Sequence, residues 1–285
     1  MTDPRLRIVV DGLTFAEGPR WHDGRLWFSD FYTHHVLCCD ADGSNLEMVC
    51  EVPGQPSGLG WLPDDRLLIV SMTDRRLLRL APDRSLIEVA DLSDLATWHC
   101  NDMVVDAHGN AFVGHFGFDL EAEPVEPVMA SLARVSIDGE VGVAADEMAF
   151  PNGSVITPDG TTLIVAETVA SKITAFDLAA DGTLSNRRVW AEVPGTYPDG
   201  ICLDAEGAVW FADALGAACI RVFEGGRVTE RIEPGRGCFA CMLGGSDRRT
   251  LYLMLAESAQ SAVVTERHDA QIAAVEVDVP GTGLP

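Results

Sequence analysis

The sequence predicts an all-β protein that forms a single six-bladed β-propeller domain over residues 1–285. A strand–turn–strand frame recurs along the chain, its segments are short and rich in β-favouring residues, and no helical period persists. A repeat of about 40–50 residues built from short strands is typical of propeller blades. The copies lie 40 to 51 residues apart and share an aligned position that is polar in most of them. That position holds Glu17, Ser57, Asn101, Asn152, Asp199 and Cys241.

The first two repeats contain the frame in full. The first contains GPRWHDG, RLWFSDF, HVLCCDAD and NLEMVCEV, and the second contains GLGWLPD, RLLIVSM, RLLRLAPD and SLIEVADL. Turn-forming residues separate these stretches, for example His22-Asp23-Gly24 in the first repeat. Each repeat therefore predicts four antiparallel strands joined by short turns.

The third repeat contains an insertion. Its first strands, MVVDAHG and NAFVGHF, are followed by GFDLEAEPVEPVMA before LARVSID resumes the frame. The inserted stretch has two prolines, four acidic residues and no clear period, which predicts a loop. A long loop in an otherwise tight repeat is a candidate lid or substrate contact.

The remaining repeats predict how the ring closes. They continue with TTLIVAE, KITAFDLA and RRVWAEV, then AVWFADA, CIRVFEGG and RVTERIEP, then TLYLMLA and QIAAVEVDV. The last repeat is one strand short, whereas residues 5–10, RLRIVV, precede the first repeat. We expect this N-terminal strand to pair as the outer strand of the last blade, because it would cover an exposed edge.

Charge and composition exclude several classes of partner. The net charge is −24, from 44 acidic and 20 basic residues, which argues against nucleic acid and anionic membranes. No stretch reaches the roughly 18 apolar residues of a membrane helix, and the first residues do not resemble a signal peptide, so a cytoplasmic location is expected. The eight cysteines are scattered, which favours free thiols. The pair Cys238 and Cys241 has no second CxxC to complete a zinc site.

The aligned polar residues predict a metal site. The first strand of each blade lines the central channel, so residues that begin these strands should converge at one end of it. Glu17, Asn101, Asn152 and Asp199 would present carboxylate and amide oxygens there. Such donors suit one divalent ion, with Ca²⁺ expected first and Mg²⁺, Mn²⁺, Zn²⁺ or Fe²⁺ as alternatives. The alternative is that these residues cap turns, as Asn-Gly and Asp-Gly often do, although Glu17 does not fit that role.

The motifs AEGPRW, HCNDMVVD, FPNGSVITPDG and YPDGICLD resemble the gluconolactonase/regucalcin family, also called senescence marker protein 30-like, over nearly the whole chain. The resemblance implies a six-bladed propeller that hydrolyses lactones and is similar to calcium-dependent diisopropylfluorophosphatases. It also implies that Glu17, Asn152 and Asp199 bind one divalent ion and that Asn101 lies at the ion or at the substrate. Asp199 is the base that the resemblance implies.

The chain departs from the family pattern at two positions. Sugar-lactone members carry Arg two residues before the Asn and Gly after Asn-Asp, whereas this chain has His99 and Met103. The loss of that Arg, with no other basic residue in the flanking segments, favours a less polar lactone. His99 could be a hydrogen-bond donor, a catalytic base or a packed loop residue. The expected substrate contacts are His99, Asn101, Asp102, Phe116 and Phe118, and the catalytic candidates are Asp199 and His99.

Two other functions stay open. The chain could hydrolyse a phosphotriester or another activated ester, or it could be a binding propeller in which the metal is structural only. The sequence lacks G-x-S-x-G, H-E-x-x-H, a P-loop and a dinucleotide fingerprint, so it offers no competing catalytic motif. A small-molecule lactone or ester is the expected partner.

Overall fold

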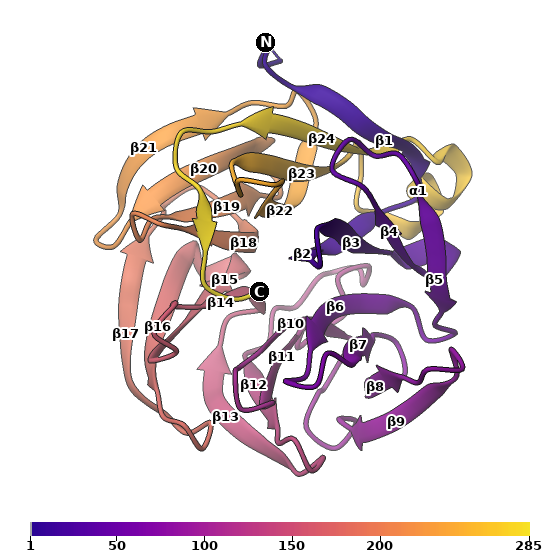
Figure 1. Ribbon diagram of the computed structural model, residues 1–285. Coiled ribbons are helices and arrows are strands. Elements are labelled where there is room, and N and C mark those ends of the chain that lie inside the picture. Colours follow the sequence, from indigo (N-terminus) through magenta and orange to yellow (C-terminus); the bar gives the residue numbers. More distant parts are fainter. Residues whose placement is uncertain (1) are drawn as a thin grey trace.

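The computed structural model describes residues 2–285 and contains six sheets arranged in a ring, as Figure 1 shows. The predicted six-bladed β-propeller is confirmed, while Met1 lies outside the described residues. In blades 1 to 3 the strands are β2 (Ala16–His22), β3 (Arg25–Asp30), β4 (His35–Cys39) and β5 (Glu47–Glu51); β6 (Pro56–Trp61), β7 (Leu67–Ser71), β8 (Arg76–Leu80) and β9 (Leu86–Asp91); and β10 (Cys100–Val105), β11 (Ala111–His115), β12 (Ala130–Val135) and β13 (Val141–Met148).

Blades 4 to 6 follow the same order from the axis outwards. Their strands are β14 (Pro151–Ile156), β15 (Thr162–Glu167), β16 (Lys172–Leu178) and β17 (Leu184–Glu192); β18 (Pro198–Asp204), β19 (Val209–Asp213), β20 (Ala218–Phe223) and β21 (Arg227–Ile232); and β22 (Gly237–Gly244), β23 (Thr250–Ala256), β24 (Ala270–Glu276) and β1 (Arg7–Leu13). The short helices are η1 (Phe31–Thr33), η2 (Thr168–Ala170) and α1 (Ser261–Arg267). Among residues 2–285 no helix is long and apolar enough to cross a membrane.

The N-terminal strand closes the ring as predicted. Strand β1 pairs antiparallel with β24, with Arg7 opposite Ala274 and Leu13 opposite Ala270. The strand begins and ends slightly later than the predicted residues 5–10. Val10 and Leu13 are buried, so β1 contributes core contacts as well as hydrogen bonds to the last blade.

The segment after β24 extends across the ring, which the sequence reasoning did not anticipate. Residues Gly281–Thr282 form β25, which pairs with Leu203 and Asp204 at the end of β18. Leu284 then bridges Ile156 at the end of β14. Figure 1 shows this yellow segment ending near the middle of the ring. It lies at the ends of the inner strands, whereas the aligned polar residues lie at their beginnings.

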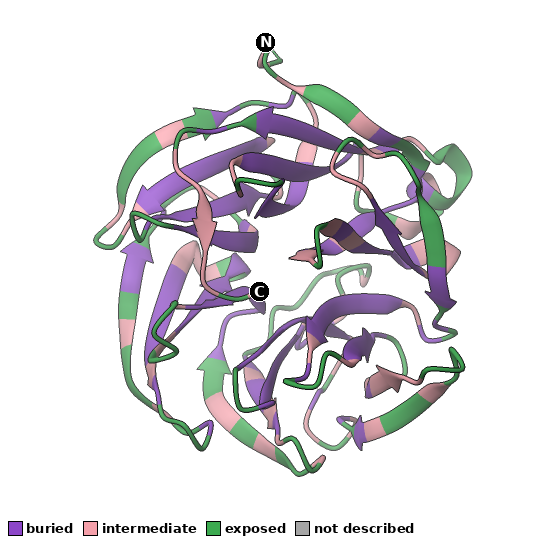
Figure 2. Ribbon diagram, viewed as in Figure 1, coloured by how far each residue is buried: buried purple, intermediate pink, exposed green. Residues whose placement is uncertain are grey.

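Residues are more deeply buried near the axis of the ring than at its outer edge. Figure 2 shows buried inner strands and outer strands that alternate between buried and exposed residues. The inner strands pack closely because glycine follows the polar position in most blades. A Cβ at Gly153 would lie 2.5 Å from the amide nitrogen of Ile201, and one at Gly58 would lie 2.4 Å from that of Met103. This close packing brings the polar residues of neighbouring blades together.

The insertion of blade 3 is a loop, as predicted, and it reaches the opposite blade. It lies between β11 and β12, and Glu121 within it accepts a 2.9 Å hydrogen bond from the amide of Ser261 at the start of α1. Helix α1 belongs to blade 6 and contacts η1 of blade 1. The sequence reasoning expected no helix here. The lid role of the loop stays a prediction.

Candidate metal centre

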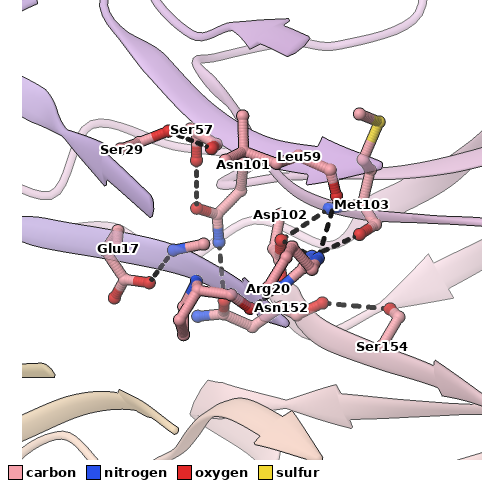
Figure 3. Close-up of polar contacts among 12 residues, drawn as sticks. Glu17, Arg20, Ser29, Ser57, Leu59, Asn101, Asp102, Met103, Asn152 and Ser154 are labelled. Atoms are coloured by element: carbon pink, nitrogen blue, oxygen red, sulfur yellow. Dashed lines mark hydrogen bonds and ion pairs between the residues drawn. The ribbon is translucent and has the colours of Figure 1, made fainter. Parts of the chain in front are cut away.

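The aligned polar residues form a hydrogen-bonded series at the beginning of the inner strands. Ser57 Oγ donates to Asn101 Oδ1 at 3.5 Å, and Asn101 Nδ2 donates to Asn152 Oδ1 at 2.9 Å. Asn152 Nδ2 then donates to Thr168 Oγ1 at 3.1 Å. Figure 3 shows the part of this series from Ser57 to Asn152, with Glu17 beside it. The structure therefore brings together side chains that the sequence places 44 and 51 residues apart.

Two carboxylates complete the group. Burial and, to a smaller extent, the charge of Asp102 raise the pKa of Glu17 to about 8, against the opposing effects of the Gly18 amide and of Arg20. Burial also raises the pKa of Asp199 well above its usual range, followed by repulsion from Glu17 and from Asp102. Glu17 and Asp199 therefore lie close enough to oppose each other's charge. Such a pair is stabilised when a cation is bound between its members.

The donor set fits a hard divalent cation. The group contains two carboxylates and two side-chain amides and no histidine, and Ca²⁺ and Mg²⁺ prefer oxygen ligands. Within residues 2–285, no group of three or more His, Cys, Asp or Glu side chains is arranged to hold a metal ion, so a zinc-type site of nitrogen and sulfur ligands is not found there. The oxygen donors of the group match the ligand preference of Ca²⁺ and Mg²⁺. The assignment of Glu17, Asn101, Asn152 and Asp199 as ligands stays a prediction.

Cys241 occupies the aligned position in blade 6, but its contacts differ from those of the polar residues in the other blades. Its Sγ lies 3.4 Å from the carbonyl oxygen of Trp210 and 3.5 Å from that of Gly200, and 3.8 Å from Cys202 Sγ. The sulfur thus packs against blade 5. All eight cysteines are buried and free, as the scattered pattern predicted.

Asp102 has a partner that the sequence did not indicate. Arg20 Nη2 lies 2.5 Å from Asp102 Oδ1, and the amide of Met103 donates to the same oxygen at 2.9 Å. Both side chains are buried. The predicted contact between Asp102 and substrate stays a prediction, and the ion pair would compete with it.

The other predicted substrate contacts lie in an aromatic group. The ring of His99 stacks on Trp98 with 4.9 Å between centroids, and it lies 6.0 Å from the ring of Phe116. Phe116 and Phe118 both pack on Phe150, at 4.9 and 6.1 Å between ring centroids. Burial lowers the pKa of His99, which favours the neutral imidazole. The catalytic and binding roles of His99 stay predictions.

A basic residue from outside the flanking segments lies near His99. Arg75, from the connection between β7 and β8, lies close enough for its charge to lower the pKa of His99. Its Nη1 donates to the carbonyl oxygen of Ala96 at 3.2 Å. The sequence reasoning missed it because Arg75 belongs to the neighbouring blade.

The chain is similar in sequence to several known proteins and in fold to solved structures. The pattern of the family described as SMP-30/gluconolactonase/LRE-like region matches residues 15–257. Regucalcin of Danio rerio is 27% identical over 260 residues, covering 86% of this chain and 84% of the relative. Diisopropyl-fluorophosphatase of Loligo vulgaris is 26% identical over 262 residues, covering 81% and 82%. A solved structure of a calcium-binding regucalcin from Agrobacterium tumefaciens superposes with a TM-score of 0.81 at 22% identity, covering 98% and 96%, and so shares the fold.

Proposed function

The chain belongs to the SMP-30/gluconolactonase/LRE-like family, and on this premise we propose that it is a divalent-metal-dependent hydrolase that opens a lactone. The observation that carries the proposal is the convergence of Asn101 and Asn152 beside two carboxylates, Glu17 and Asp199, that oppose each other's charge. Glu17, Asn152 and Asp199 would hold the ion, and Asn101 would lie at the ion or the substrate. When bound, a divalent ion of this kind polarises the carbonyl oxygen of the substrate as a Lewis acid.

The residues of the chain then provide the proton transfers. Water adds to the carbonyl carbon of the lactone, the ring C–O bond breaks, and the ring oxygen leaves with a proton as a hydroxyl group. Asp199 is the proposed base that takes a proton from the attacking water. Because a carboxylate that binds a cation is a weak base, Asp199 would have to leave the ion to do so. His99 is the alternative base, since its lowered pKa leaves the imidazole free to accept a proton.

The residues around the group support a substrate less polar than a sugar lactone. His99 stands where related sugar lactonases carry Arg, and it lies against Trp98 and Phe116. Phe116 in turn packs on Phe150, so aromatic rings pack beside His99, although the charges of Asp119, Arg75 and Glu121 also act on it. A binding site with apolar walls and few polar groups favours an alkyl or aromatic lactone.

The test is hydrolysis of a lactone with and without metal. Proton release from dihydrocoumarin would be followed with protein treated with chelator and then supplied with Ca²⁺ or Mg²⁺. We expect turnover to disappear on chelation and to return with one of these ions, and Glu17→Gln to stay inactive. Glu51→Gln, the same change at an exposed position of β5, is the matched control. Turnover that persists without metal, or a metal-bound protein that opens no lactone, contradicts the proposal.

A phosphoester substrate is the second candidate, because one relative is a diisopropyl-fluorophosphatase. The same arrangement would polarise a phosphoryl oxygen in place of a carbonyl oxygen. Including diisopropyl fluorophosphate in the assay, with fluoride release as the readout, distinguishes the two. Metal binding without turnover of either substrate would favour the binding propeller instead.

A further inference from the structure

Arg20 is a buried arginine that the proposed reaction does not use. It lies on β2 with 3% of its surface exposed. Its Nε donates to Leu59 O at 2.8 Å, and its Nη2 lies 2.6 Å from Met103 O and 2.5 Å from Asp102 Oδ1. These partners belong to blades 2 and 3. Figure 3 shows the guanidinium surrounded by these groups.

The ion pair lies directly beside the proposed metal centre. Arg20 follows Glu17 by three positions on β2, and Asp102 follows Asn101 on β10. The charge of Asp102 opposes those of Glu17 and Asp199, while the charge of Arg20 favours ionised Glu17. Three carboxylates therefore share this region, and Arg20 compensates one of them.

We propose that Arg20 holds Asp102 away from the ion and so limits the ion site to two effective negative charges, which makes it selective for divalent over trivalent cations. The inference rests on the ion site of the proposed function. Two carboxylates balance a divalent ion. A third, uncompensated carboxylate would attract every cation more strongly, and the gain is larger for a trivalent ion because the Coulomb energy scales with its charge.

A purely structural role makes a different prediction. Arg20 joins the inner strands of three blades, so its loss could lower stability whatever happens to the ion. Removal of a stabilising contact alone would leave the relative affinity for divalent and trivalent ions unchanged. The ratio of the two affinities therefore separates the two roles.

The experiment measures ion affinity in four proteins: the unsubstituted chain, Arg20→Met, Asp102→Asn and the double variant. The probes are Ca²⁺ by calorimetry and Tb³⁺ by luminescence titration, which need no turnover. In Arg20→Met we expect the preference for Tb³⁺ over Ca²⁺ to rise by at least about tenfold. The double variant has neither charge and should return the preference to within about threefold of the unsubstituted chain.

The remaining outcomes also decide the question. If Arg20→Met does not fold, Asp102→Asn is the deciding variant: it leaves Arg20 uncompensated and should weaken Tb³⁺ binding more than Ca²⁺ binding. An unchanged preference in the folded single variants overturns the inference and leaves the proposed function intact. Calorimetry with Mg²⁺ is added for the unsubstituted chain, and binding of neither Ca²⁺ nor Mg²⁺ overturns the proposed function itself.

Discussion

Asn101 and Asn152 are 51 residues apart in sequence, yet Nδ2 of the first donates a 2.9 Å hydrogen bond to Oδ1 of the second. The orientation of Asn152 is fixed on its other side by Thr168, whose Oγ1 accepts from Asn152 Nδ2 at 3.1 Å. Thr168 can accept because its own proton is donated to Pro198 O at 2.8 Å. The hydroxyl of Thr168 therefore determines which way the amide oxygen of Asn152 faces.

Thr168→Val should weaken divalent-ion binding by about tenfold, because residues that orient ligands commonly have effects of this size. Valine has the same shape as threonine but cannot accept the hydrogen bond from Asn152, so the amide loses its fixed orientation. Thr168→Ser keeps the hydroxyl and should retain the affinity. Calorimetric titration with Ca²⁺ checks this, and equal affinity in the valine and serine variants would refute it.

Glu17→Gln, Asn152→Ala and Asp199→Asn should each weaken metal binding and lower kcat/KM at least about a hundredfold, as loss of an electrostatic catalytic element does. Ser57→Ala and Cys241→Ala, at the same aligned position, should leave the metal content unchanged. Elemental analysis of the purified proteins and lactone assays provide the measurements. The shared site would be wrong if two of the three ligand variants kept near-native metal content and rate.

His115 should make stability depend on pH. Burial lowers its pKa to about 4 from 6.5, so the unfolded chain binds the proton more readily than the folded protein between these values. The folded state should therefore have its full stability above about pH 6.5 and lose this contribution as the pH falls towards 4. His115→Leu should show a smaller fall in Tm between pH 7 and pH 5. Identical pH profiles of the two proteins would contradict the assignment.

Deletion of residues 1–10 should cause aggregation or a large loss of thermal stability. The deletion removes most of β1, the outer strand of blade 6, and exposes the edge of β24. Thermal melts and light scattering check the result. A truncated protein that stays monomeric and equally stable would show that closure by β1 is dispensable.

An aryl-fused or long-chain lactone should be hydrolysed faster than gluconolactone under the same metal ion. Each buried methylene contributes only about 1 kcal/mol, so the preference should be graded over a series of chain lengths. The values of kcat/KM for the series provide the measurement. Equal or faster turnover of gluconolactone would show that His99, or the nearby Arg75, replaces the missing arginine.

The blades and the aligned polar position follow from local features of the sequence. Strand periodicity and turn residues are local patterns. A repeat that recurs six times is therefore visible in the sequence without knowledge of long-range contacts. For this reason the sequence alone predicts that Glu17, Asn101, Asn152 and Asp199 lie near one another. Closure by the N-terminal strand also followed, because the last repeat had one strand too few.

Contacts among side chains at and near that position depend on how neighbouring blades pack. Cys241 has the same register as Asn152, but its sulfur packs against the carbonyl oxygen of Trp210 in blade 5. Arg20 and Asp102 are 82 residues apart and pair only because neighbouring inner strands pack closely enough for the guanidinium to reach blade 3. Such contacts depend on the distance between neighbouring blades and on the rotation that relates them. The repeat in the sequence specifies neither the distance nor the rotation.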